Sequence, residues 1–368
     1  MSFDGLRLML VGPLPPPAGG MANQTRQLAD KLALEGAKVE LVQTNAPYRP
    51  AWLAGMPGIR AIARLLPYLV ALWRAAARND VMHVMANSGW SWHLFAAPAI
   101  WIGWLRACPV VVNYRGGEAE PFLMKHAAMV RLTMARAAVL AVPSGFLQGV
   151  FGRFGMSAVI VPNAVDVERF SPTPPRPCGN APHLVVTRNL EAIYDNETAI
   201  RALALFRRQF TGAHLTIAGE GPERQRLEAL ALELGLQESV FFAGRLDRDG
   251  VVALYGCADV MINPSRVDNT PNSVLEALAC GVPVVSTNVG GVPFLVEDDR
   301  TALLVPPGDP QAMCDALIRL FTTDRLIHRL HEAGLAHVAQ FSWPAVRRRL
   351  ADTYSTVLPA TDRQPDRR

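Results

Sequence analysis

Short apolar runs that alternate with longer amphipathic stretches constrain the fold of this chain more than any other feature of its sequence. The runs are continuous and rich in Val and Ile, as expected of strands that are covered on both faces. They lie at residues 6–11, 39–42, 81–85, 110–113, 139–142, 159–161, 183–187, 215–218, 240–243, 260–263, 284–286 and 303–305. Stretches such as 24–34, 223–234 and 312–320 have helical periodicity. The alternation predicts an α/β chain with enough strands for two parallel sheets.

A proline-rich segment separates these strands into two groups. Residues 171–182 contain five prolines, which cannot donate the hydrogen bonds of a regular strand or helix, so we expect a stiff linker there. The domains are then residues 1–170 and 183–342. We expect a last helix within 343–358 to cross back to the N-terminal domain, and residues 359–368 to be disordered.

The composition argues against several classes of protein. Half of the 368 residues are hydrophobic, which suffices for two packed cores. The net charge of +4, without long runs of one sign, argues against nucleic-acid binding and is compatible with anionic ligands or an anionic membrane surface. The five cysteines are far apart and form no C-x-x-C pair, which favours a reducing compartment without disulfides or structural zinc.

Two features bear on location. The N-terminus lacks the basic start and long apolar core of a secretory signal, and the longest apolar stretch, 94–105, is too short to span a bilayer. We therefore expect a cytoplasmic protein.

Residues 59–78 place apolar residues on one helical face and arginines opposite, and two interpretations remain open. The segment is either a membrane-surface helix or a helix docked on its own domain. The residues of the apolar face are Ile59, Ile62, Leu66, Leu69, Trp73 and Ala76.

The most informative local pattern lies in the C-terminal half. A buried strand ends at Asn263, a polar loop follows, and a helix begins near Asn272 or Ser273. The free N–H groups and the dipole of a helix N-terminus suit a phosphate. Asp268 in the loop and Glu276 in the helix add two carboxylates that can accept hydrogen bonds from hydroxyls. A nucleotide sugar offers a diphosphate, ribose hydroxyls and hexose hydroxyls, and therefore matches this combination.

The run from Asp268 to residue 285 resembles the E-x7-E region of retaining GT-B glycosyltransferases, in particular glycosyltransferase family 4. Asp268 stands at the position of the first Glu, and Glu276 matches the second. The resemblance implies that Asp268 binds the donor hexose and that Glu276 binds the ribose. It also implies a set of residues whose backbone groups hold the sugar and the phosphates: Asn269, Thr270, Pro271, Asn272 and Ser273.

Other segments match the family in order and spacing. Gly219 and Gly221 lie in a strand–helix turn that resembles the family's turn beside the nucleotide base, although a tight turn that simply needs glycine is an equally valid interpretation. The resemblance runs from about residue 6 to 341. It implies the GT-B fold: two Rossmann-like parallel-sheet domains that face a central cleft, with the acceptor bound by the first and the donor by the second.

Arg188 follows the strand at 183–187 and matches the family arginine that neutralises the donor diphosphate. A cation there would stabilise the departing nucleoside diphosphate as the sugar–phosphate bond breaks. Family members usually carry a lysine a few residues later, but here Tyr194 and its polar neighbours occupy that region. Either Arg245 supplies the second positive charge, or stabilisation of the leaving group is weaker in this chain.

The N-terminal half carries weaker signals. Gly19 and Gly20 resemble the family's Gly-Gly loop, which reaches toward the donor phosphate and the acceptor; a plain turn is the alternative. Arg115 stands where family members often place a histidine. Arginine cannot act as a base, but it can bind a sugar, a donor phosphate or the phosphate of a lipid carrier. His83, on another strand, is either a polar group at the cleft or a satisfied core histidine, and the second interpretation is favoured.

These observations predict a hexosyltransferase-type glycosyltransferase (EC 2.4) that moves a sugar, with retention, from a nucleoside diphosphate sugar to a glycan or a lipid-linked acceptor. Arg115, Arg188 and Asp268 are the candidate catalytic residues. No cofactor is expected, and no metal, because the D-x-D pattern at Asp247 and Asp249 coincides with a predicted helix start. We expect a role in cell-surface polysaccharide synthesis, with peripheral membrane contact and no nucleic-acid partner. Two alternatives remain open: a nucleotide-sugar epimerase of GT-B fold, and a non-catalytic sugar-nucleotide-binding scaffold.

Overall fold

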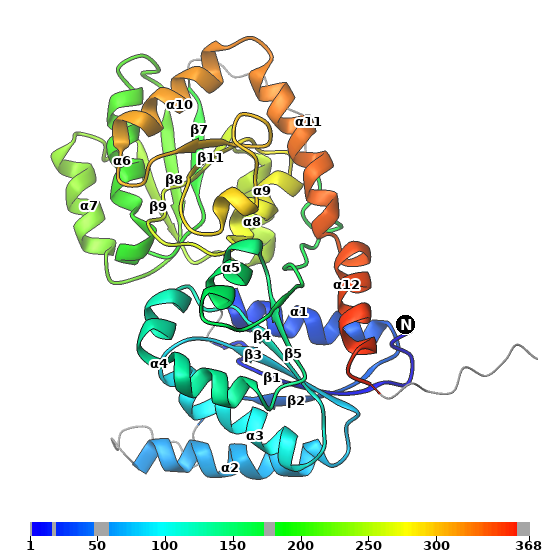
Figure 1. Cartoon of the computed structure of the whole chain (residues 1–368). Helices are drawn as coiled ribbons and strands as arrows, with labels where there is room; N and C mark the ends of the chain where they lie inside the picture. Colours follow the sequence, from blue (N-terminus) through cyan, green and yellow to red (C-terminus); the bar gives the residue numbers. More distant parts are fainter. Residues whose placement is uncertain (1, 17–19, 48–58, 173–180, 359–368) are drawn as a thin grey trace, which may run out of the picture. The chain divides into compact units, whose positions relative to one another are not determined.

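The computed structural model describes residues 2–16, 20–47, 59–172 and 181–358 (Figure 1). Its contacts divide the chain into two compact units, unit 1 with Met1–Asn163 and Val346–Arg368, and unit 2 with Ala164–Ala345. The division therefore falls before the proline-rich segment. Val165 and Phe170 are buried in the core of unit 2, which draws the residues ahead of that segment into the second unit. Most of 171–182, and all of 359–368, lie outside the described residues.

Unit 1 contains a six-stranded parallel sheet with the order β2-β1-β3-β4-β5-β6. Its strands are β1 (Arg7–Gly12), β2 (Lys38–Gln43), β3 (Val81–Ala86), β4 (Val110–Tyr114), β5 (Val139–Val142) and β6 (Val159–Ile160). Its helices are α1 (Gly20–Leu34), α2 (Ile59–Ala76), the π-helix Trp92–Ala96, α3 (Ala97–Leu105), α4 (Ala119–Met134), α5 (Gly145–Arg153) and most of α12 (Trp343–Ser355). The strand order reverses between β1 and β3.

Unit 2 contains a second six-stranded parallel sheet, with the order β12-β11-β10-β7-β8-β9. Its strands are β7 (His183–Val186), β8 (His214–Ala218), β9 (Val240–Gly244), β10 (Val260–Asn263), β11 (Val284–Thr287) and β12 (Leu303–Val305). Its α-helices are α6 (Asn196–Phe206), α7 (Arg224–Glu233), α8 (Arg248–Gly256), α9 (Asn272–Ala279), α10 (Pro310–Thr322) and α11 (Leu326–Val338). Here the strand order reverses between β10 and β7.

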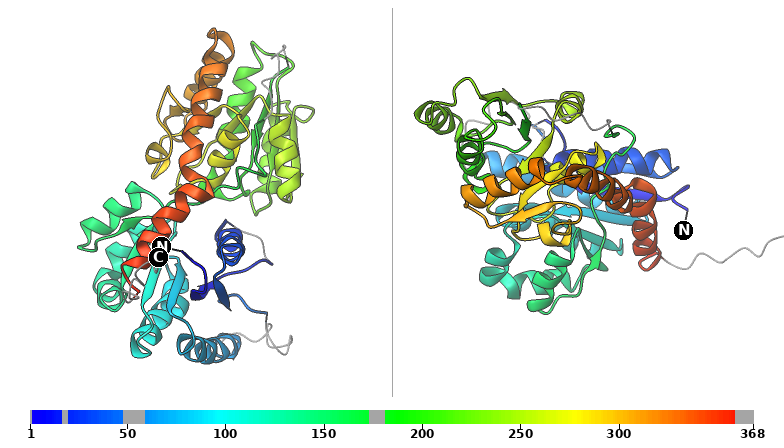
Figure 2. Two further views of the ribbon diagram at one scale, coloured as in Figure 1. Left: turned by 90° about the vertical axis from the view of Figure 1, so that its right-hand side faces the viewer. Right: turned by 90° about the horizontal axis from the view of Figure 1, so that it is seen from above.

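Burial alternates along the strands between two faces, and this explains the continuous apolar runs in the sequence. In β7, Leu184 and Val186 pack into one core cluster, whereas Val185 packs into another. Helices lie on both faces of each sheet (Figures 1 and 2), so the side chains on both faces of each strand are covered. Each of the predicted strands is present, and the predicted α/β fold with two parallel sheets is confirmed.

The predicted apolar face of α2 is wrong in part. Tyr68, Leu72 and Ala76 are buried in the core of unit 1, whereas Leu66 and Trp73 are 58% and 46% exposed. The helix therefore docks on its own domain, and a separate apolar stripe faces solvent. The stretch 94–105 forms the end of the π-helix and α3. Within the described ranges, no helix has the length and apolarity that crossing a membrane requires.

Candidate functional site

The carboxyl ends of β7 and β10 form the strand-order switch of unit 2. Parallel α/β sheets bind ligands at such a point, because the loops after the two strands leave in opposite directions and open a crevice between them. Arg188 lies two residues after β7, and Ser265 lies two residues after β10. Arg188, which the sequence placed at a strand end, and Ser265 therefore come to one edge of the sheet.

Arg188 is held at this edge by a set of buried partners. Its Nε donates to Oδ1 of Asn263 (3.1 Å), its Nη2 donates to Oγ of Ser265 (3.3 Å), and its guanidinium forms an ion pair with Asp268. The ring of Tyr194 lies under the guanidinium, 4.6 Å from its carbon. Burial lowers the pKa of Arg188. The structure therefore brings Arg188 and Asp268 together, and an aromatic ring occupies the region in which the family lysine is absent.

A buried polar network supports the loop that follows β10. Asn263 Nδ2 donates to Oγ of Ser286 (3.0 Å), and Thr287 Oγ1 donates to the carbonyl of Ser265 (2.6 Å). Further along, Arg266 Nε donates to Oδ2 of Asp195 (2.9 Å). These hydrogen bonds tie the end of β10 and the start of the loop to β11 and to Asp195, which fixes the direction in which the loop leaves the sheet.

Three glycines, Gly219, Gly221 and Gly291, permit a close approach of backbone segments at the site. Cβ atoms on Gly219 and Gly221 would clash with the carbonyl oxygens of Arg188 and Leu190. Leu190 N also donates to the carbonyl of Glu220 at 3.0 Å. The Gly-x-Gly turn therefore packs against the segment that carries Arg188, which supports the structural interpretation of these glycines.

Gly291 packs in the same way against the loop that carries Asp268. A Cβ there would clash with the carbonyl oxygen of Asn269, and Gly291 N already donates to the carbonyl of Asp268 at 2.9 Å. We expect Gly291→Ala to displace the loop and weaken nucleotide binding about tenfold or more, since overpacking costs about 1–3 kcal/mol. Gly149→Ala in α5, where the added methyl meets open space, is the control. Unchanged affinity of Gly291→Ala by calorimetry would contradict this account.

Helix α9 begins directly after this loop. Pro271 occupies its N-cap and supplies no side-chain cap, and Tyr255 in α8 donates its hydroxyl hydrogen to the carbonyl of Ser273 (3.0 Å). The Tyr255 hydroxyl also lies 2.6 Å from Thr187 Oγ1, so it ties the end of β7 to the start of α9. Asn269, Pro271 and Ser273 are buried here. The helix N-terminus and the Asp268 loop thus lie beside the Arg188 segment.

Glu276 is a partly buried carboxyl group on α9. Desolvation by burial raises its pKa to about 7, against the opposing effect of Arg248 and Arg188. Arg248 begins α8 and acts on Glu276, whereas Arg245 is 45% exposed and pairs with Glu220 at 3.4 Å. The structure therefore makes Arg248, rather than Arg245, the candidate for a second cation near Glu276.

The D-x-D pattern serves a structural purpose. Asp247 is the N-cap of α8 and accepts a hydrogen bond from Gly250 N at 2.8 Å, as the sequence predicted. Asp249 pairs with Arg169 at 2.7 Å. Among the described residues, no group of three or more His, Cys, Asp or Glu side chains is placed to hold a metal ion.

Sequence reasoning missed several residues of this site. Asn263 and Ser265 stood in the segment of interest as polar groups at the end of a buried strand, a position that itself signals a site in a parallel sheet. Tyr194 and Arg248 were noticed only for other reasons. Tyr255 lies in an apolar helical stretch, and nothing in the sequence distinguishes it from a core tyrosine.

In unit 1, Arg115 follows β4 and has neutral partners. Its Nε donates to Oδ1 of Asn113 (3.1 Å), and its Nη1 donates to Gln24 Oε1 (3.3 Å) and to Asn163 Oδ1. Within the described part of the chain, its hydrogen-bond partners are all side-chain amides and none is a carboxylate. Burial lowers its pKa to about 10, so it remains a cation at neutral pH. An uncompensated, desolvated cation is costly and suits an anionic ligand.

The other predicted residues of unit 1 differ in outcome. His83 is fully buried and bonded on both ring nitrogens, so its interpretation as a satisfied core histidine is confirmed. Gly20 begins α1 and is exposed, while Gly19 lies outside the described residues.

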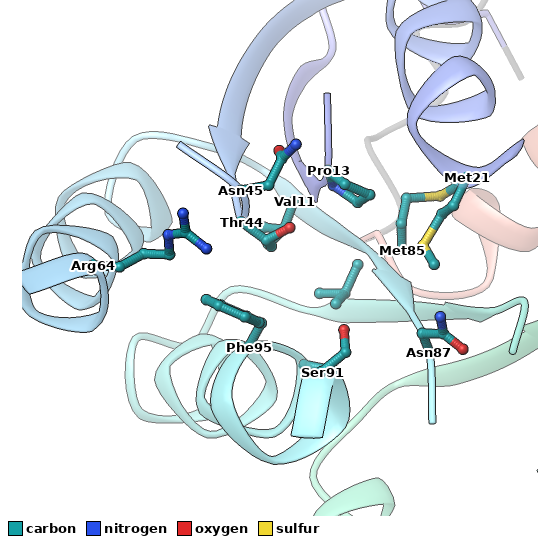
Figure 3. A pocket seen from close by; sticks show the side chains of 12 residues that line it. Val11, Pro13, Met21, Thr44, Asn45, Arg64, Met85, Asn87, Ser91 and Phe95 are labelled. Carbon is teal, nitrogen blue, oxygen red and sulfur yellow. The ribbon is translucent and has the colours of Figure 1, made fainter. Parts of the chain in front are cut away.

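A pocket of about 250 Å³ opens at the strand-order switch of unit 1 (Figure 3). Arg64 of α2 points into it from one side, and Phe95 and Ser91 lie opposite the ends of β1 and β2. The lining combines one cation, several hydroxyl or amide groups and an apolar floor: Val11, Pro13, Met21, Thr44, Asn45, Arg64, Val84, Met85, Asn87, Ser91, Phe95 and Ala96.

Two family models match the chain. The model described as Glycosyltransferase Family 4 matches residues 18–169, and the model described as Glycosyl transferases group 1 matches residues 181–323. The chain is 32% identical over 226 residues to a D-inositol 3-phosphate glycosyltransferase of Corynebacterium jeikeium. The matched region covers 56% of this chain and 54% of that protein. A GDP-mannose-dependent alpha-(1-6)-phosphatidylinositol monomannoside mannosyltransferase of Mycobacterium tuberculosis is 27% identical over 380 residues, covering 94% and 97%.

Solved structures show the same fold. Sucrose-phosphate synthase from Thermosynechococcus elongatus has a TM-score of 0.77 and 21% identity, covering 95% of this chain and 98% of that one. Anabaena HepE, solved with UDP and glucose, has a TM-score of 0.73 and 17% identity, covering 95% and 100%.

Two parallel-sheet units, with a basic and acidic site at the switch point of the second, define the GT-B class of glycosyltransferase. The family models match consecutive parts of the chain that together make up most of its length, and the chain belongs to glycosyltransferase family 4. Its similar relatives are named as glycosyltransferases and mannosyltransferases.

Proposed function

We propose that the protein is a retaining glycosyltransferase that moves a hexose from a nucleoside diphosphate sugar to a hydroxyl of a lipid-linked acceptor. The observation that carries the proposal is the buried Arg188–Asp268 pair beside the N-terminus of α9, at the strand-order switch of unit 2. A buried pair of opposite charges at a ligand-binding edge suits a donor that brings both anionic phosphates and hydroxyls.

The donor groups follow from the chemistry of these residues. The diphosphate accepts hydrogen bonds from Arg188 and from the N–H groups at the start of α9. Asp268 accepts hydrogen bonds from the hexose hydroxyls, and Glu276 accepts them from the ribose hydroxyls. Arg248 favours the ionised form of Glu276 and adds positive charge to the site. Names of the relatives make GDP-mannose the first donor to test.

The reaction breaks the bond between the anomeric carbon and the distal phosphate oxygen, and the electron pair departs with that oxygen. The acceptor hydroxyl attacks the same face of the sugar and gives its proton to the departing phosphate, so the anomeric configuration is retained. Arg188 stabilises the charge that develops on the nucleoside diphosphate. We propose that no metal ion is required, because protein cations neutralise the leaving group.

Unit 1 supplies the acceptor side. Arg115 is a partly buried cation whose three hydrogen-bond partners are neutral amides, and the pocket at the β1–β3 switch presents Arg64 together with hydroxyl and amide groups. These groups fit a phosphorylated, hydroxyl-bearing head group better than a neutral glycan. Relatives named for phosphatidylinositol monomannoside and D-inositol 3-phosphate support that class of acceptor.

An exposed apolar surface on unit 1 supports peripheral membrane contact. Leu66, Val70 and Trp73 form a stripe along α2, and all three are at least 46% exposed. Arg106 stacks on Trp73 at 4.8 Å, and Arg136 stacks on Trp104 at 4.5 Å. Tryptophans beside arginines are typical of surfaces that lie at the head-group level of anionic membranes. We propose that this surface contacts the cytoplasmic face of the membrane and that the protein acts there in the synthesis of a surface glycan.

The membrane proposal predicts the effect of a charge on this stripe. Val70→Glu removes apolar contact and adds an anion, and we expect binding to vesicles rich in anionic lipid to fall about tenfold. Leu232→Glu, at an exposed leucine of α7, is the matched control and should bind vesicles normally. Equal binding of the two variants in vesicle sedimentation would rule out α2 as the contact surface.

A binding and turnover series tests the function itself. Calorimetry with UDP, GDP and ADP identifies the base, and the matching sugar nucleotides are then incubated with and without lipid extract. Sugar transfer to a lipid only when extract is present, unaffected by EDTA, supports the proposal. Interconversion of the donor sugar without acceptor would instead show an epimerase, and nucleotide-sugar binding without any turnover would show a scaffold subunit.

A further inference from the structure

A chain of buried hydrogen bonds runs through unit 1 from the C-terminal helix α12 to Arg115. Tyr354 in α12 and His83 in β3 are fully buried, and Asn113 in β4 is 1% exposed. The Tyr354 hydroxyl lies 2.8 Å from Nδ1 of His83, and Nε2 of His83 lies 3.1 Å from Nδ2 of Asn113. Asn113 Oδ1 in turn accepts the Arg115 Nε hydrogen at 3.1 Å.

The direction of each hydrogen bond in this chain follows from Arg115. A guanidinium has only donors, so the oxygen of the Asn113 amide must face it and the NH₂ group must face His83. Nε2 of His83 then accepts, and its single proton lies on Nδ1 and is donated to the Tyr354 oxygen. All three bonds point the same way, an arrangement in which each polarises the next.

This orientation does not change near neutral pH. A second proton on His83 would set N–H against the NH₂ of Asn113 and place a positive charge beside Arg115. Burial and the nearby Arg115 lower the pKa of His83 to about 3, so the ring stays neutral. The Arg115 guanidinium is thus held at Nε by this chain of hydrogen bonds and at Nη1 by Gln24 and Asn163. In the described part of the chain, Nη2 meets no hydrogen-bond partner.

We propose that Tyr354 is a positioning residue for the transfer reaction: through His83 and Asn113 it holds the Arg115 guanidinium so that Nη2 is available to a phosphate group of the substrate. The inference rests on the proposed function, in which Arg115 binds an anionic substrate group. It adds that the C-terminal helix, distant in sequence from every other residue of the site, takes part in the geometry of that group.

Tyr354→Phe tests the proposal with a minimal change. The ring keeps its edge contacts with Phe3 and His83, and only the hydroxyl that accepts from His83 is lost. We expect kcat/KM for glycosyl transfer to fall tenfold to about a hundredfold, since small misplacements of a substrate-binding group have effects of this size. Thr353→Val is the matched control, because it removes a buried hydroxyl of the same helix that bonds only to Arg349 O (2.7 Å). The control should keep kcat/KM within about twofold at a similar loss of stability.

A double-mutant cycle separates positioning from a purely structural effect. In an Arg115→Met background the hydrogen-bond chain has no guanidinium to position. Tyr354→Phe should therefore cause no further loss of kcat/KM in that background. The same fold loss in both backgrounds would overturn the proposal, because the hydroxyl would then act independently of Arg115.

Nitrogen NMR of labelled histidine shows which ring nitrogen of His83 carries the proton, and it needs no substrate. Wild-type His83 should carry its proton on Nδ1, because Nε2 accepts from the Asn113 amide; a wild-type proton on Nε2 would overturn the proposed hydrogen-bond chain. If Arg115→Met leaves kcat/KM unchanged while the Nδ1 proton is observed, the role of Arg115 in the proposed function is at fault.

Discussion

Arg188→Ala should lower kcat by about 10²–10³-fold, because the group that stabilises charge on the departing diphosphate is lost. The same substitution leaves Asp268, which is 10% exposed, without its ion-pair partner. An uncompensated carboxylate at this depth costs about 3–5 kcal/mol, so we also expect the free energy of unfolding of unit 2 to fall. Initial rates and urea unfolding measure the two effects separately.

The paired substitution Arg188→Met with Asp268→Leu distinguishes catalysis from stability. Apolar replacement of a buried ion pair is often neutral or stabilising, so the double variant should unfold close to wild type and still show no transfer. Retention of more than a tenth of the wild-type kcat by Arg188→Ala would mean that Arg188 is only a structural partner of Asp268. Recovery of activity in the double variant would lead to the same conclusion.

Glu276→Gln should make the apo protein more stable at pH 8 while weakening donor binding about a hundredfold. The raised pKa of Glu276, about 7, means that the folded state holds its proton more tightly than the unfolded state. Wild-type stability therefore falls as pH rises between the ordinary carboxyl pKa and about 7, and glutamine escapes this loss. The stabilisation is about 3 kcal/mol above pH 8 and vanishes below about pH 4.5.

The affinity for the donor should change with pH in the opposite direction to the stability of the protein. The ionised carboxylate accepts hydrogen bonds from ribose hydroxyls, so wild-type donor affinity should rise as pH increases through about 7, and the glutamine variant should show no such rise. Glu233→Gln, at an exposed acid of α7, is the control and should change neither quantity. A Glu276→Gln protein with wild-type affinity at pH 8 would refute the ribose-binding role.

Many features of the fold and the donor site were predictable from local sequence. Each strand was recognisable because strands covered on both faces need apolar side chains at every position. Asp268 and Glu276 were identified because their spacing around a helix start is a local pattern. The pairing of Asp268 with Arg188 was not predictable, because it joins loops after two strands that are neighbours only in the folded sheet.

Helix α2 illustrates the limit of a helical wheel. Periodicity detects apolar residues but cannot tell which of two apolar stripes meets the core. The structure buries Tyr68 and Leu72 and leaves Leu66, Val70 and Trp73 in solvent. The proline-rich segment similarly suggested a domain boundary, whereas packing of Val165 and Phe170 assigns the preceding residues to unit 2.

By itself, the sequence determined the fold class, the order of strands and helices, and the acidic loop–helix pattern, because these depend on neighbours along the chain. Only the tertiary structure decided that Tyr194 stacks on Arg188, that Gly291 packs on Asn269, and that Tyr354 reaches Arg115 through His83. These contacts depend on which strands lie side by side and on which residues become desolvated together. Burial then gives Glu276 its raised pKa and leaves Arg115 a cation balanced only by amides, properties that no local pattern encodes.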